Sequence, residues 1–181
     1  MKIVFTGAQG VGKTTLLDVL EKCFTFNMNF NFIYNFTRNI AKKGYQINEA
    51  GTDDTQKAIM KLHQEIVEGA EDVIMDRCAL DGFVYTTYLK NKGRISEDTF
   101  NYCRQVFESC ICKYDIIFYL KPEFPITGDE YRSDKQGYQT EIANIFEDII
   151  QYYNINTIKL TGTVGDRLQK IKQVLGEIIK C

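Results

Sequence analysis

The residues with the clearest chemical potential lie near the start of the chain, in the segment Gly7-Ala8-Gln9-Gly10-Val11-Gly12-Lys13-Thr14. This segment matches G-x-x-x-x-G-K-[ST] at every fixed position, and it lies between an apolar, β-branched run and a helical pattern, as the motif requires. Glycines let the backbone curl so that successive N–H groups face an anion, and the positive end of the following helix adds its dipole. The segment therefore predicts a loop that binds nucleotide phosphates.

The side chains of this loop suggest which ligands it takes. Lys13 would bring a positive charge to the β and γ phosphates, and Thr14 would offer a hydroxyl to Mg²⁺, which otherwise binds phosphate oxygens and water. We expect ATP and Mg²⁺ as cofactors. The residues expected to contact the nucleotide are Gly7, Gln9, Gly10, Val11, Gly12, Lys13, Thr14 and Thr15.

A carboxylate and a guanidinium follow the short apolar run Val73–Met75 as Asp76 and Arg77. The carboxyl ends of strands are the rim where open α/β sheets bind ligands. There Asp76 could hold Mg²⁺ or accept the proton of an acceptor hydroxyl, and Arg77 could clamp a phosphate. An Asp-Arg dipeptide is a weak motif, and an ion pair on the surface at the strand end is the alternative.

Two more segments carry cations that could reach the same rim. Asn35-Phe36-Thr37-Arg38 follows the second expected strand, where Arg38 could bind an anionic acceptor or the ribose region. Arg132 lies in a polar segment, about residues 123–137, that could close over the triphosphate as a lid and stabilise charge on the transferring phosphoryl group. Simple solvation of these side chains is the alternative in both segments.

Strand and helix patterns alternate along the chain without a repeat or linker. They predict one α/β domain over residues 1–181, with a five-stranded parallel sheet between two layers of helices. The expected strands are Lys2–Thr6, Phe24–Phe32, Val73–Met75, Asp115–Leu120 and Asn156–Leu160, with the second at an edge and the fourth inside the sheet. The expected helices are Lys13–Cys23, Phe36–Lys43, Thr52–Ala70, Ala79–Leu89, Ser96–Cys112, Gln139–Tyr152 and Val164–Lys180.

The composition is that of an ordinary soluble protein: 181 residues, 44% hydrophobic, 25% charged, with a net charge of -2. No global positive field draws the chain to nucleic acid or anionic lipid. We find neither a membrane-spanning segment nor a signal peptide, so we expect a cytoplasmic protein. Six cysteines without a CxxC pair favour reduced thiols, and His63, the only histidine, is expected to be solvated or packed in a helix.

Other residues narrow the class of phosphate-loop protein. The string nearest to a guanine-reading motif is Asn91-Lys92-Gly93-Arg94, which lacks the aspartate of that motif. An LSGGQ string of the ABC type is absent, and the chain lacks the second helical domain of larger mechanical ATPases. A small kinase remains as the expected class.

The sequence resembles the small P-loop kinases, most of all the AAA-like ATP-binding family that includes nicotinamide riboside kinase domains. Thymidylate and deoxynucleoside kinases are more distant. The resemblance runs through GAQGVGKT, NFTR, MDRCALDGFVYTTYL, GDEYR and LTGTVGDR, and only the first string is specific by itself. It implies the P-loop NTPase fold. It also implies site positions at Asp76, Arg77, Asp81, Tyr85 and the lid arginine Arg132, with Thr161–Arg167 near the adenine.

One departure from this resemblance bears on the acceptor. Where the family usually has Glu-x-x-Arg, this chain has Asn35 and Arg38. The hydroxyl of a nucleoside benefits from a nearby general base, whereas a nucleoside monophosphate is already ionised. The absence of this carboxylate therefore slightly favours a monophosphate as the acceptor. Asp76 would be the base for a nucleoside.

We therefore expect an ATP- and Mg²⁺-dependent kinase for a small nucleoside or nucleotide. A kinase for DNA or a modified base in DNA, and a nucleotide-dependent switch or ATPase, are the alternatives. The acidic pI of about 5.5 counts mildly against nucleic acid as a partner. The oligomeric state stays open, with a homodimer among the states that the sequence allows.

Overall fold

A five-stranded parallel sheet forms the centre of the computed structural model, which describes residues 1–23, 25–26, 29–34, 36–123, 137–176 and 179–180. The strands run in the order β3-β4-β1-β5-β6, and each neighbouring pair is parallel. Their bounds are β1 Lys2–Thr6, β3 Asn31–Ile33, β4 Val73–Asp76, β5 Ile116–Leu120 and β6 Ile158–Leu160. The predicted α/β class and the five parallel strands are confirmed.

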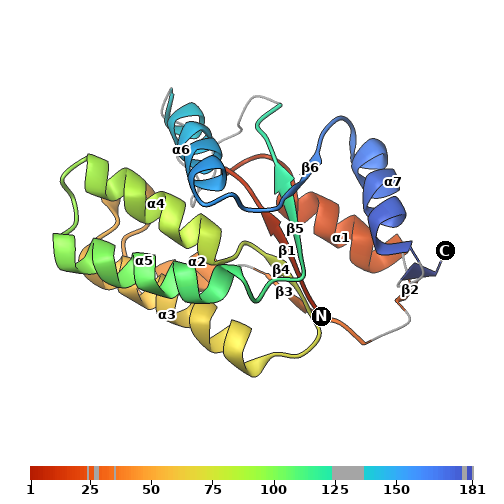
Figure 1. Cartoon of the computed structure of the whole chain (residues 1–181), viewed down its shortest axis with the longest axis horizontal. Coiled ribbons are helices and arrows are strands. Elements are labelled where there is room, and N and C mark those ends of the chain that lie inside the picture. The colour runs from red at the N-terminus through yellow and green to blue at the C-terminus, as the bar shows by residue number, and fades with distance from the viewer. Residues whose placement is uncertain (24, 27–28, 35, 124–136, 177–178, 181) are drawn as a thin grey trace.

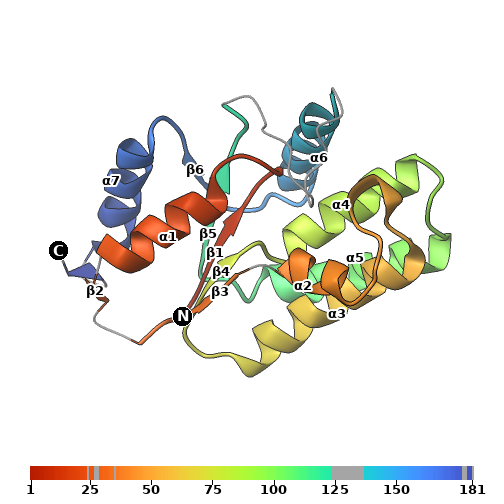
Figure 2. The same ribbon diagram turned by 180° about the vertical axis from the view of Figure 1, so that it is seen from behind.

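Helices cover both faces of this sheet (Figure 1). Helices α1 (Lys13–Cys23) and α7 (Val164–Leu175) pack together on one face. The other face is covered by the group α3 (Asp53–Gly69), α4 (Ala79–Asn91) and α5 (Glu97–Ile111), which Figure 2 shows from behind. Helix α6 (Tyr138–Tyr152) packs on α4, and the short α2 (Phe36–Lys42) packs on α3. A 3-10 helix, η1, spans Asn48–Ala50.

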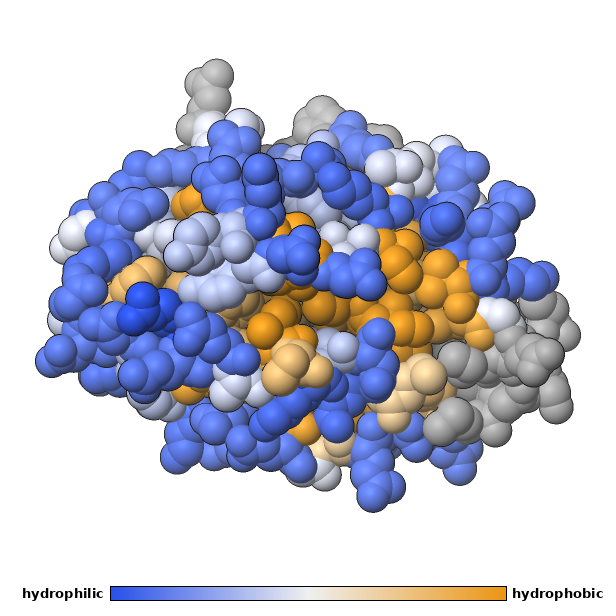
Figure 3. Space-filling model, in the orientation of Figure 1, coloured by the Kyte–Doolittle hydropathy of each residue, from blue (hydrophilic) through white to orange (hydrophobic). Residues whose placement is uncertain are grey.

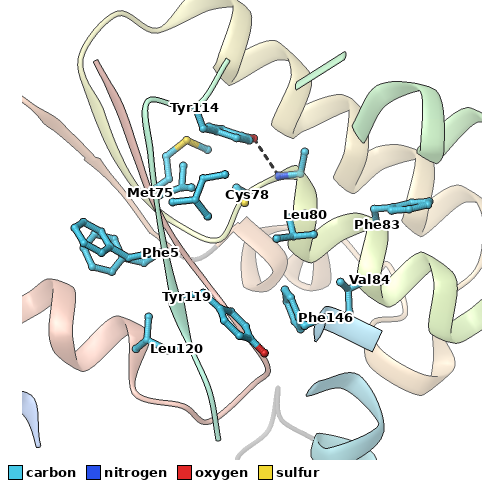
Figure 4. Close-up of a cluster of buried hydrophobic side chains, with 14 of the residues drawn as sticks. Phe5, Met75, Cys78, Leu80, Phe83, Val84, Tyr114, Tyr119, Leu120 and Phe146 are labelled. Atoms are coloured by element: carbon cyan, nitrogen blue, oxygen red, sulfur yellow. Dashed lines mark hydrogen bonds between the residues drawn. The ribbon is translucent and has the colours of Figure 1, made fainter. Parts of the chain in front are cut away.

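The core sits between the sheet and its helices because the central strands are apolar on both faces. Phe5 of β1 and Phe118 of β5 are fully buried and stack with ring centroids 4.9 Å apart. Side chains from α4 and α6 meet Tyr119 of β5 on one side of the sheet (Figure 4). The same figure shows the Tyr114 hydroxyl accepting a 3.0 Å hydrogen bond from the Ala79 backbone N–H, which satisfies a donor at the start of α4.

Helix α3 begins where its sequence indicates. The Thr52 hydroxyl accepts a 3.3 Å hydrogen bond from the Thr55 backbone N–H, so Thr52 is the N-cap. Asp53 occupies the first turn instead, where it also accepts a 2.9 Å hydrogen bond from the Ser96 backbone N–H. The sequence offered either residue as the cap, and the structure selects the threonine.

Two predicted elements are wrong in their extent. The segment 24–32 is not one strand, because β2 (Thr25–Phe26) and β3 belong to different sheets. The alternation of apolar and polar residues indicates a strand with one solvent-exposed face, but it cannot locate a break between two short strands. Helix α7 ends at Leu175 rather than Lys180, since Gly176 follows with a positive φ of 46°. Residues beyond it form β7 (Ile179–Lys180), which pairs antiparallel with β2.

The surface shows how hydrophobic and hydrophilic residues are distributed over the molecule. On the face of Figure 3, hydrophobic residues gather over the central part of the molecule, and hydrophilic residues dominate the periphery. Among the helices that the structure describes, none is long and apolar enough to cross a membrane.

The stacked pair in the core makes a stability prediction. Phe118→Ala removes a fully buried ring that packs on Phe5, so we expect the free energy of unfolding to fall by about 3–5 kcal/mol. Urea denaturation followed by circular dichroism measures this change. Tyr152→Ala, which removes an aromatic side chain from a residue that is 82% exposed, is the control and should change stability by about 0.5 kcal/mol or less. Equal losses in both variants would contradict this packing.

Candidate active site

The phosphate loop follows the central strand β1 and ends at the start of α1, as its motif requires. Gly10 and Gly12 have positive φ values of 76° and 87°, which side-chain-bearing residues rarely adopt. At Gly7 a Cβ would overlap the carbonyl oxygen of Leu120 at the end of β5. Glycine is therefore needed at all three positions, either for the backbone turn or for close packing.

Lys13 is drawn into this loop. Its Nζ donates hydrogen bonds to the carbonyl oxygens of Gly7 (2.6 Å) and Ala8 (2.8 Å), and the residue is only 5% exposed. The first helical bond of α1 runs from the Leu16 N–H to the Gly12 carbonyl at 3.0 Å. A buried ammonium thus stands over the loop at the positive end of a helix, an arrangement that suits an anion.

Thr14 and Asp76 come together although 62 residues separate them in the sequence. The Thr14 hydroxyl donates a 2.5 Å hydrogen bond to Oδ2 of Asp76. The other oxygen, Oδ1, is buried and has no hydrogen-bond partner among the described residues. A hydroxyl and a carboxylate are hard oxygen donors, and Mg²⁺ typically takes one or two protein ligands and completes its shell with phosphate and water. The pair therefore fits Mg²⁺, and no cluster of three acidic, His or Cys ligands is found among the described residues.

Arg77 follows in a strained backbone conformation, with a positive φ of 84° and its N–H bonded to the Phe5 carbonyl at 2.9 Å. Its Nη1 lies 3.9 Å from Oδ1 of Asp81, and its guanidinium lies over the Tyr85 ring at 5.5 Å. Burial lowers the pKa of Arg77, but Tyr85, Asp81 and Asp76 outweigh burial and raise it. Since Asp76 is only 6% exposed and Arg77 pairs with Asp81, the alternative of a surface ion pair does not describe this site.

Asp81 holds this cluster in place. Its Oδ2 accepts hydrogen bonds from the Thr6 hydroxyl (2.7 Å) and the Cys78 backbone N–H (2.9 Å), and its residue is 2% exposed. With Cys78 it forms the capping box of α4. The carboxylate thus joins the end of β1 to the start of α4 and orients Arg77.

Tyr85 lies one turn further along α4. Burial raises the pKa of its hydroxyl, which Arg77 opposes, and the Gln9 backbone also interacts with it. The predicted residues Asp81 and Tyr85 therefore join Arg77 in one cluster that contacts the phosphate loop.

This cluster forms one wall of a cavity of about 20 Å³, space for one water molecule. A sugar or base must widen it to enter. The residues that line it come from α2, η1, α3 and α4, namely Thr37, Asn48, Gln56, Ile59, His63, Arg77, Asp81, Gly82 and Tyr85. Close packing of the helices narrows it, since a Cβ at Gly82 would overlap Met60 Sδ.

Asn48, Gln56 and His63 line this cavity although none of them was predicted from the sequence as a site residue. Gln56 and His63 are 2% and 1% exposed and lie two turns apart on the buried face of α3. Burial and the nearby charge of Arg77 lower the pKa of His63 to about 3, so its imidazole is neutral near neutral pH. The only sequence signal is that both polar residues share the helical face of Ile59 and Val67.

Arg167, predicted to contact the nucleotide, touches the loop itself. Its Nη1 donates a 2.7 Å hydrogen bond to the Val11 carbonyl, and its Nη2 pairs with Oε2 of Glu123 at 2.7 Å. Gln139 at the start of α6, which the sequence analysis did not single out, donates a 2.7 Å hydrogen bond from Nε2 to the Gln9 carbonyl.

Of the remaining predicted residues, Thr15 and Arg38 are described, and the others lie outside the described part of the chain. Thr15 is exposed in the first turn of α1. Arg38 is partly buried in α2 but does not line the cavity. Asn35, Arg132 and residues 124–136 of the predicted lid lie outside the described residues.

A parallel sheet with this loop between its central strand and first helix defines a P-loop nucleoside triphosphate-binding protein. More specifically, the model of the AAA domain family matches residues 2–167, and the chain belongs to that family. No curated protein matches the sequence.

Three solved structures illustrate the fold. A NadR protein in complex with NR has 17% identity and a TM-score of 0.72, over 98% of this chain and 50% of that one. A deoxyadenosine kinase from M. mycoides has 14% identity and a TM-score of 0.63, over 98% and 97%. A thymidylate kinase from Candida albicans has 14% identity and a TM-score of 0.60, over 96% and 89%. At identities this low, these TM-scores show a shared fold.

The buried His63 makes a prediction about pH. Its pKa is about 3 in the folded chain against 6.5 when solvated, so the unfolded chain binds more protons between these values. This contribution to stability is complete above pH 6.5 and is lost as the pH falls towards 3. Between pH 7.5 and 5.5 it should lower the free energy of unfolding by about 1.4 kcal/mol.

Urea denaturation of the natural chain and of His63→Gln at both pH values tests this expectation. The variant should lose that part of the pH dependence, whatever its absolute stability. A pH dependence that is the same in both proteins would show that folding does not lower the pKa of His63.

Proposed function

We propose that this chain is an ATP- and Mg²⁺-dependent kinase that transfers the γ-phosphoryl group to a small nucleoside or nucleotide. The observation that carries the proposal is the contact between the two halves of the site. The phosphate loop supplies Thr14, which bonds Asp76, and the next residue, Arg77, forms a wall of the cavity with Asp81 and Tyr85. A nucleotide on the loop and an acceptor in the widened cavity would then meet at Asp76 and Arg77.

Each residue has a defined part in this proposal. Lys13 and the loop amides hold the β and γ phosphates, and Thr14 with Asp76 holds Mg²⁺, which neutralises phosphate charge. Arg77 attracts charge that develops on the transferring group. The acceptor oxygen bonds to the γ-phosphorus as the bond to the β–γ bridging oxygen breaks, and ADP leaves. A hydroxyl acceptor also loses a proton, for which Asp76 is our candidate base.

The charges of the cavity favour a nucleoside over a nucleoside monophosphate as this acceptor. Among the lining residues, Arg77 and Asp81 carry the formal charges, and they pair with each other. A monophosphate carries about -1.5 to -2 charges at neutral pH and would lie beside the buried Asp81 carboxylate. The other polar lining groups are hydroxyl, amide and neutral imidazole groups, which suit sugar hydroxyls and base edges. The charges of the cavity thus oppose the slight expectation of a monophosphate acceptor that Asn35 suggested.

One assay separates the proposed function from its alternatives. Purified protein is incubated with γ-labelled ATP, Mg²⁺, matched nucleosides and monophosphates, and an oligonucleotide. We expect labelled nucleoside monophosphate. Labelled diphosphate would keep the kinase and change its acceptor class, labelled oligonucleotide would indicate a DNA kinase, and free phosphate alone would indicate an ATPase or switch.

Asp76→Asn tests the residue that joins the two halves of the site. Turnover should fall by about 10²–10⁴-fold because the variant loses a Mg²⁺ ligand and the candidate base, whereas affinity for ATP should fall less than tenfold. Initial rates and calorimetric titration with ATP measure the two quantities. Asp98→Asn, an exposed aspartate in the first turn of α5, is the matched control and should keep normal turnover. Near-normal turnover in Asp76→Asn would remove the proposed role.

A further inference from the structure

Two side chains from distant helices hold carbonyl groups of the phosphate loop. Gln139 of α6 bonds the Gln9 carbonyl, and Arg167 of α7 bonds the Val11 carbonyl, each at 2.7 Å. The two contacts lie 130 and 156 residues apart in the sequence, and they alternate along the loop. We call Gln139 and Arg167 the loop clamps.

The planar peptide bond turns these contacts into a constraint on the opposite side of the loop. In a trans peptide the C=O of one residue and the N–H of the next point in opposite directions. Holding the Gln9 carbonyl therefore directs the Gly10 N–H away from Gln139, and holding the Val11 carbonyl directs the Gly12 N–H away from Arg167. Both glycines have positive φ values, which lets alternate amides turn to the same side as an anion-binding nest.

The peptide units nearer β1 are oriented differently. The Gly7 and Ala8 carbonyls accept hydrogen bonds from Lys13, and the Gln9 backbone interacts with Tyr85 instead. The amides of Gly10 and Gly12 are thus the ones whose direction depends on the two clamps.

Arg167 is itself held firmly. It is 3% exposed, and the Glu123 carboxylate that pairs with it also accepts a 2.9 Å hydrogen bond from the Gly162 N–H. A Cβ at Gly12 would lie in ordinary van der Waals contact with Nη1, at 3.4 Å, so the guanidinium lies against the backbone of the loop. These contacts within the fold set the position of this arginine.

We propose that Gln139 and Arg167 are positioning residues that preorganise the Gly10 and Gly12 amides for the terminal phosphates of the nucleotide. Neither side chain need touch the nucleotide for this role. This differs from the expectation of the sequence analysis, in which Arg167 contacts the nucleotide in a segment near the adenine. The inference rests on the proposed nucleotide binding but not on phosphoryl transfer to any particular acceptor.

Inorganic tripolyphosphate, which has phosphates but no base, separates the two roles of Arg167. Calorimetry should measure Mg²⁺-dependent binding of ATP and of tripolyphosphate to the natural chain, Arg167→Gln and Gln139→Ala. We expect each variant to bind both ligands about tenfold more weakly, since each loses the bond that holds one amide. Arg167→Lys, which keeps a donor for the Val11 carbonyl, should recover part of the loss.

Exposed residues on the same helices provide matched controls. Lys170→Gln on α7 and Gln151→Ala on α6 should bind both ligands like the natural chain. Thermal unfolding checks that each variant is folded, and Gln139→Ala keeps the test decisive if Arg167→Gln unfolds.

The outcomes separate this inference from the proposed function. Weaker binding of ATP with unchanged binding of tripolyphosphate would overturn it for Arg167 and favour a contact with the adenosine part. Unchanged binding of both ligands by both variants would overturn it altogether. If the natural chain bound neither ligand, nucleotide binding itself would fail, and the proposed function with it.

Discussion

The direction of a few peptide planes between β1 and α1 is the constraint on which the site depends. Backbone amides can bind a phosphate together only if their N–H groups point to the same side of the loop. In a loop without glycine, successive N–H groups would point to both sides. Glycines make the required turns accessible, and contacts from β5, α6 and α7 select them. The sheet and its helices therefore matter for function mainly because they bring these distant contacts to one short loop.

The acceptor side follows a similar logic around Asp81. This carboxylate bonds β1 through Thr6, caps α4, and pairs with Arg77, so one side chain relates the central strand, the helix and the guanidinium. Arg77 in turn has a strained backbone conformation with a positive φ, which the surrounding contacts maintain. Loop and cavity are joined through Asp76 and Tyr85, so their relative position is set by β4 and α4 rather than by surface loops.

The sequence predicted features whose signal is local. The loop motif, the apolar strands β1 and β5 and the helical periodicities are readable within short windows, and all are found in the fold. The segment 24–32 failed because its pattern continues across two strands in different sheets. Gln56 was not singled out, and His63 was expected only to be solvated or packed in a helix, because a polar residue on a buried helical face shows no sign of a site until the neighbouring helix is placed. The contact of Arg167 with Val11 spans 156 residues and has no local signature at all.

The tight approach of α3 to α4 has a consequence for attempts to alter the preferred acceptor. That side of the cavity has no space for larger side chains, because Gly82 packs against Met60 and because Gln56 and His63 are buried. Thr37 and Asn48 lie on the short elements α2 and η1, which carry less of the core. Engineering libraries would accordingly find most of their tolerated diversity at Thr37, because Asn48 has a positive φ of 55°, which most other side chains rarely adopt.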